Sequence, residues 1–180
     1  INRMRAAAAL PDIPKPSAKT ASALIEQSRI VGGGAAEQQV ASAALLALGA
    51  LSHKTQRAQP EVAELVRNDL NERLRSPQNK QDVALALDAI GNTGDKSFVD
   101  TVKRYEKDDN ELVRAHAAQS LRRMDLETSE PILADWLGRE ADPMVRKSIA
   151  SALNEKLHED QRAASPSTVL SAAARLTEEA

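Results

Sequence analysis

The chain has 180 residues, of which 42% are hydrophobic but only 2% aromatic, with one Phe, one Tyr and one Trp. Alanine and leucine must therefore supply the buried surface, which is unusual for a globular core and typical of closely packed helices. The absence of cysteine excludes disulfides and thiolate metal sites, and the net charge of −2, without a repeated basic stripe, argues against nucleic acid as a ligand. No stretch reaches the roughly 18 apolar residues of a transmembrane segment, so we expect a soluble protein, either cytoplasmic or exported.

Two regions are predicted along the chain. Residues 1–16 should form a proline-rich irregular arm, because Pro11, Pro14 and Pro16 each lack an amide donor and bias the preceding residue towards extended backbone. Residues 17–180 are predicted to be a helical-repeat domain. The first residue, Ile1, is not methionine, which suggests a processed product or a piece of a larger protein.

Apolar residues at three- and four-residue spacing, together with capping residues, predict about nine helices and no strand. Pro60 should open one helix, Asn110 should cap another, and Asp142 should cap a helix that begins at Pro143. Thr128 or Ser129 is expected to cap the helix that carries Pro131 in its first turn. The predicted helices are 17–30, 35–51, 60–74, 83–90, a segment after Asp95 that buries Phe98, Val99, Val102 and Tyr105, 111–124, the helix with Pro131, the helix from Pro143, and 167–178.

A set of landmarks recurs about every thirty residues, which is the signature of an α-helical solenoid. The copies, in chain order, are Ala44-Leu45 with Leu48, Ala86-Leu87 with Ile90, Ala117-Ala118 with Leu121, and Ile149-Ala150 with Leu153. Val113-Arg114 likewise returns as Val145-Arg146. The spacing is 31 or 32 residues except for the first step, which is 42 residues long. The pattern predicts an all-α fold.

These motifs resemble known repeat families. Gly94-Asp95, Asp108-Asp109, Val113-Arg114 and Ala117-Ala118 look like the landmarks of HEAT-like α-solenoids, in which an A helix and a B helix form each repeat. The resemblance implies a right-handed alpha-alpha superhelix. A HEAT-like solenoid also implies B helices along the inner curve.

A narrower resemblance covers roughly residues 40–157 and includes the long first spacing. Segments 44–54, 85–94 and 113–124 look like successive segments of the helical domain in large lipid transfer proteins, the family of the vitellogenins and the microsomal triglyceride transfer protein. This resemblance implies a helical arch that surrounds lipid-binding β-sheets and contacts protein partners, with no catalytic residues. The chain contains no such sheets and so should not enclose lipid alone.

The candidate binding residues lie opposite the core stripe. At 100° per residue Val113, Ala117 and Leu121 face inward, which leaves the other side of that helix for recognition. The repeat shifts map these positions onto the neighbouring helices. The resulting concave strip for a protein partner consists of Asp88, His116, Gln119, Arg123, Ser148, Ser151 and Glu155. A merely solvated polar face is the alternative reading of the same pattern.

Two acid and arginine pairs also recur, Asp109 with Arg114 and Asp142 with Arg146. We interpret these arginines as structural, because an Arg early in each B helix can bind neighbouring turns through carboxylates or carbonyls.

Catalysis and metal binding have no signal in the sequence. His53, His116 and His158 are far apart, and none lies at i+3 or i+4 from another. We therefore predict no enzyme, no metal and no cofactor. The leading hypothesis is a non-catalytic scaffold that binds a protein partner or an adjacent domain of the same protein. The alternative is the helical arch of a lipid-transport protein, which would meet lipid only through that larger protein.

Overall fold

The computed structural model describes residues 17–29 and 34–163 of the chain. The predicted arm, 1–16, and the predicted last helix, 167–178, lie outside the described residues. Within the described ranges all regular structure is helical, which confirms the all-α prediction. The elements are α2 (Ala18–Ser28), α3 (Ala35–Thr55), α4 (Pro60–Arg75), α5 (Lys80–Thr93), a 3₁₀ helix (Lys96–Phe98), α6 (Val99–Lys103), α7 (Glu111–Ser120), α8 (Leu126–Arg139) and α9 (Pro143–Ala163).

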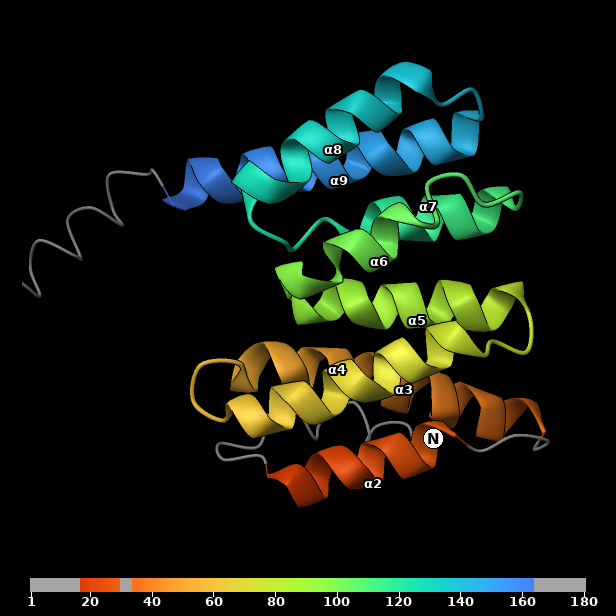
Figure 1. The fold of residues 1–180 in the computed structure, drawn as a ribbon, viewed down its shortest axis with the longest axis vertical. Helices are drawn as coiled ribbons and strands as arrows, with labels where there is room; N and C mark the ends of the chain where they lie inside the picture. Colours follow the sequence, from red (N-terminus) through yellow and green to blue (C-terminus); the bar gives the residue numbers. More distant parts are fainter. Residues whose placement is uncertain (1–16, 30–33, 164–180) are drawn as a thin grey trace, which may run out of the picture.

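The helices form two layers. Within each layer, the helices follow one another in chain order along the long axis of the molecule (Figure 1). In one layer α3 packs on α5, α5 on α7, and α7 on α9. We call these four helices the stacked row. In the other layer α2 and α4 contact α3, α6 contacts α7, and α8 contacts α9. This alternation is that of a helical solenoid, as the repeated landmarks predicted.

The repeat landmarks fill the core between the layers. Val113, Ala117 and Leu121 are each 0% exposed, and so are their repeat equivalents Val145 and Ile149. Helical periodicity places such residues on one side of each helix, where they pack against both the neighbouring repeat and the helix behind. The inward stripe predicted from the sequence is therefore confirmed for these residues.

Side-chain caps explain several helix starts. Asn110 caps α7 as predicted, since its Oδ1 accepts hydrogen bonds from the amides of Leu112 (3.0 Å) and Val113 (3.2 Å). Helix α5 begins at Lys80 rather than at residue 83, because Asn79 accepts a hydrogen bond from the Asp82 amide at 2.9 Å. It ends at Gly94, whose φ of 60° lies in the left-handed region that glycine adopts without strain.

The predicted start of α8 is wrong. Asp125, and not Thr128 or Ser129, caps this helix by accepting a hydrogen bond from the Thr128 amide at 2.9 Å. Pro131 consequently lies inside the helix instead of in its first turn. The sequence indicated a later start because proline favours the first helical turn.

The predicted end of α7 is also wrong. The helix stops at Ser120, and the next residues form tighter turns in which the amides of Leu121, Arg122 and Met124 each bond to the carbonyl three residues earlier. The side chains after Ser120 therefore leave the helical register that was used to place Arg123.

None of the described helices combines the length and the hydropathy that crossing a bilayer requires.

Candidate functional site

The residues of the predicted strip lie on three neighbouring helices of the stacked row and on the turn after α7. Asp88 is in α5, His116 and Gln119 are in α7, and the three remaining helical members, Ser148, Ser151 and Glu155, are in α9. Arg123 follows the end of α7. The role of these residues in binding stays a prediction.

The structure brings several of these residues together in pairs between adjacent helices. His116 Nδ1 lies 2.6 Å from Asp88 Oδ1, which joins α7 to α5. The side-chain amide of Gln119 donates a hydrogen bond of 2.7 Å to the backbone carbonyl of Ser148, which joins α7 to α9. Strip residues of one repeat thus contact strip positions of the next, and part of their polar capacity holds the solenoid together.

A second line of polar contacts, which the sequence prediction missed, crosses the whole stacked row. Asn92 of α5 donates from Nδ2 to the carbonyl of Leu46 in α3 at 3.3 Å and accepts from the Arg122 guanidinium at 2.8 Å. Arg122 Nε also lies 4.0 Å from Glu155 Oε2 of α9. Burial lowers the pKa of Arg122, as does the neighbouring Arg123, while Glu155 and Asp88 oppose the decrease.

Arg122, and not Arg123, makes these contacts because α7 ends at Ser120. Arg122 is not a member of the predicted strip. Arg123 is exposed, and no hydrogen bond or ion pair involves it in the part of the chain that the structure describes. Ser151 is exposed as well, and Glu155 keeps 43% of its side-chain surface. These three residues leave polar surface available beside the paired ones.

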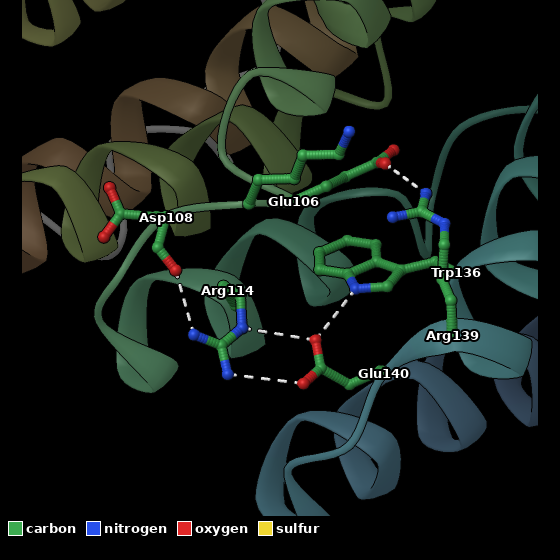
Figure 2. Close-up of a pocket in the computed structure, with 7 residues that line it drawn as sticks. Glu106, Asp108, Arg114, Trp136, Arg139 and Glu140 are labelled. Carbon is green, nitrogen blue, oxygen red and sulfur yellow. Dashed lines mark hydrogen bonds and ion pairs between the residues drawn. The ribbon is translucent and has the colours of Figure 1, made fainter.

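The early arginines of the B helices have the structural role that the sequence predicted. Arg114 donates 2.9 Å to the carbonyl of Asp108 and forms a two-point ion pair with Glu140, at 3.2 and 3.3 Å (Figure 2). Arg146 donates to the carbonyls of Leu137 and Glu140, at 2.9 Å each. Each arginine therefore fixes the loop that leads into its own helix.

The carboxylates that neighbour these arginines in sequence have other partners. Asp109 accepts from Lys80 Nζ at 2.8 Å, and Asp142 caps α9 through the amides of Met144 and Val145. Ion pairing between repeats, as between Lys80 and the loop after α6, depends on tertiary geometry and has no local sequence signal.

Glu140 collects the largest number of donors in this region. Besides Arg114 it accepts from the Trp136 indole N–H at 3.1 Å and from the Asp142 amide at 3.0 Å. Burial raises the pKa of Glu140, but the hydrogen bonds from the Asp142 amide, from Arg114 and from Trp136 outweigh it. The pKa of Glu140 therefore lies below its ordinary value of 4.5, and the carboxylate is charged at neutral pH.

Glu140→Gln is expected to lower the free energy of unfolding by about 2 kcal/mol at neutral pH, because hydrogen bonds to a charged acceptor are lost or weakened. A depressed carboxyl pKa stabilises the fold above the unfolded pKa, and this contribution disappears as the pH falls through the folded pKa. The difference from wild type should accordingly shrink below about pH 4. Urea unfolding across the acid range measures this difference, with Glu130→Gln, an exposed change in α8, as control. A constant difference at all pH values would contradict the assignment.

The two histidines whose side chains the structure describes each contact a neighbouring helix. His53 Nδ1 lies 3.0 Å from the carbonyl of Thr93, and His116 is paired with Asp88. No group of three or more potential ligand side chains capable of holding a metal ion occurs among the described residues.

Comparison with known families gives one match. Residues 70–154 match the family model for HEAT repeats, which covers α5, α6, α7 and α8 and parts of α4 and α9. No curated protein matches the chain. The chain therefore contains HEAT-like helical repeats, whereas the narrower resemblance to large lipid transfer proteins receives no support.

Proposed function

We propose that the chain is a scaffold that binds a protein partner through the predicted strip on its stacked row. HEAT repeats commonly serve as protein-interaction scaffolds. The observation that carries the proposal is the pairing of Asp88 with His116 and of Gln119 with Ser148, which links consecutive helices along the predicted strip. A partner would meet side chains that are already held in position, so little entropy would be lost on binding.

The exposed members of the strip supply the groups for recognition. Arg123 and Ser151 are exposed, and Glu155 keeps 43% of its side-chain surface. A cation, a hydroxyl and a carboxylate suit a polar protein surface, and arginine is enriched among the residues that dominate binding energy. These features favour a protein partner.

Site-specific photo-crosslinking tests the proposal. A photoreactive phenylalanine at Ser151 should capture a partner in cells that express the full chain. The same residue at Glu130, an exposed position of α8 in the other layer, should not capture it. Capture from Glu130 alone, or from neither position, would remove the strip as the interface.

Arg123→Glu is expected to lower the affinity for the captured partner by about tenfold or more, since charge reversal at an interface removes an attraction and adds a repulsion. The matched control is Arg75→Glu, the same charge change at an exposed position of α4. Binding is measured by titration of purified proteins, and equal effects of the two substitutions would argue for nonspecific charge attraction.

The alternative function, the arch of a lipid-transport protein, stays an untested prediction from the sequence. The family match concerns the helical repeats and gives no evidence for lipid transport.

A further inference from the structure

A groove of about 500 Å³ runs along one face of α3, the first described helix of the stacked row. All described residues that line it belong to this helix, and none of them is charged. Their spacing of three and four residues places them on the same side of α3. The lining residues are Ala35, Gln38, Gln39, Ser42, Ala43 and Leu46. We call this surface the α3 groove.

The α3 groove is open where the other faces of the helix are closed. Ala44 and Leu48 of the core face are 0% exposed, and α2, α4 and α5 all pack on α3. Ala43 and Leu46 of the groove are only partly buried. An uncharged hollow with alanine and leucine in its lining gains most from burying apolar side chains. The groove therefore favours an apolar segment.

The α3 groove lies on the same face of the stacked row as the strip. The step of 42 residues that relates Ala44 to Ala86 also relates Leu46 to Asp88. The two helices are joined at this level, because Asn92 of α5 donates to the Leu46 carbonyl at 3.3 Å. The face is thus uncharged at α3 and carries charged side chains from α5 onward.

The chain itself contains a segment of matching composition. Sixteen residues precede Ser17 and lie outside the described part of the structure. Residues 6–10 read Ala-Ala-Ala-Ala-Leu, with Met4 shortly before them. This run carries no charge, and its small side chains can approach the equally small Ser42 and Ala43 closely, which favours dispersion contacts.

The segment is tethered within reach of the α3 groove. Helix α3 has 21 residues and is therefore about 31 Å long. Helix α2, which follows Ser17, packs on α3, and residues 11–16 alone can span up to about 20 Å. A tether of this kind gives the segment an effective concentration of about a millimolar, which favours it over a free partner.

We propose that residues 4–10 dock in the α3 groove and bury Leu10 there, so that the chain covers the start of its own stacked row. The terminal repeats of a solenoid require such a cover, because one of their sides has no neighbouring repeat. The proposal does not depend on the partner-binding role of the strip.

Thiol labelling tests the proposal, because the chain has no cysteine of its own. Ser42→Cys places a single thiol in the groove, and Ser151→Cys places one at an exposed position of α9. Leu10→Asp should raise the labelling rate of the Ser42→Cys variant by about tenfold, since burial of a leucine side chain shifts an equilibrium by at least this factor. It should leave the rate of the Ser151→Cys variant unchanged.

The matched control is Asn2→Asp, which adds the same charge outside the apolar run and should change neither rate. No increase in the Ser42→Cys variant, or an equal increase in both variants, would overturn the proposal.

A disulfide scan identifies what covers the groove. Alanine is replaced by cysteine at each of residues 6–9 in turn, in the full chain that also carries Ser42→Cys. At least one of these pairs should form a disulfide within a single chain under mild oxidation, and none should do so with Ser151→Cys instead. Disulfides that join two chains would assign the groove to a second copy. That result, or no disulfide at any of the four positions, would overturn the proposal.

Discussion

Leu121→Asp is expected to lower the free energy of unfolding by about 4 kcal/mol or more. Leu121 is 0% exposed and belongs to the core cluster between the two helix layers. A carboxylate there would lose its hydration in an apolar core, which we expect to cost about 4 kcal/mol or more. Domains are stable by only about 5–15 kcal/mol, so a loss of this size removes a large part of the stability. Far-UV circular dichroism during urea unfolding measures the change.

The matched control is Met144→Asp, the same kind of substitution at a hydrophobic side chain that is 42% exposed. It should change the free energy of unfolding by less than about 0.5 kcal/mol, as surface substitutions generally do. Similar stability of the two variants would mean that Leu121 is not in the core, and the repeat alignment that places it there would have to be abandoned.

The core and the helical class were predictable from the sequence because burial follows the helical period. Val113 and Ala117 recur as the buried Val145 and Ile149, which a shift of 32 residues was sufficient to identify, whereas Leu153, the equivalent of Leu121, is partly buried. Each repeat presents the same apolar stripe to its neighbours, so the buried positions of one repeat predict those of the others.

Helix ends were less predictable because they depend on competition between nearby signals. Asp125, Thr128 and Ser129 are all good capping residues, and Pro131 favoured the later ones. In the structure the Ser129 hydroxyl donates to the Asp125 carbonyl at 2.9 Å, inside the first turn of α8. The earlier cap therefore uses Ser129 as well, a combination that no single-residue preference reveals.

The arrangement of the candidate site could be predicted only in part. Helical geometry identified the face that carries His116 and Gln119, but not that the first would meet Asp88 and the second the Ser148 carbonyl. Those contacts depend on how closely adjacent helices approach.

Gly49→Ala tests that close approach. Gly49 directly follows the landmark Leu48 of the first repeat, and a Cβ atom at this position of α3 would overlap the Ala89 carbonyl oxygen of α5. It would also lie 2.9 Å from the Cβ of Asn92, which is closer than real Cβ atoms come. A backbone oxygen cannot rotate away as a flexible side chain can, so α3 and α5 must separate. We expect the free energy of unfolding to fall by about 3 kcal/mol, at the upper end of overpacking effects.

Alanine is otherwise the better helix former, and Gly138→Ala isolates this opposite effect. Gly138 is in α8, and a Cβ atom there would meet nothing within 4 Å. This control should raise the free energy of unfolding by about 0.5 kcal/mol, from the helix preference of alanine alone. Gly91, the repeat equivalent of Gly49, faces Ser120 of α7, where a Cβ atom would lie 2.9 Å from Cα. Gly91→Ala should also lower the free energy of unfolding, because both glycines allow adjacent helices of the stacked row to approach closely. A stabilising effect of alanine at either position would show that these helices are further apart.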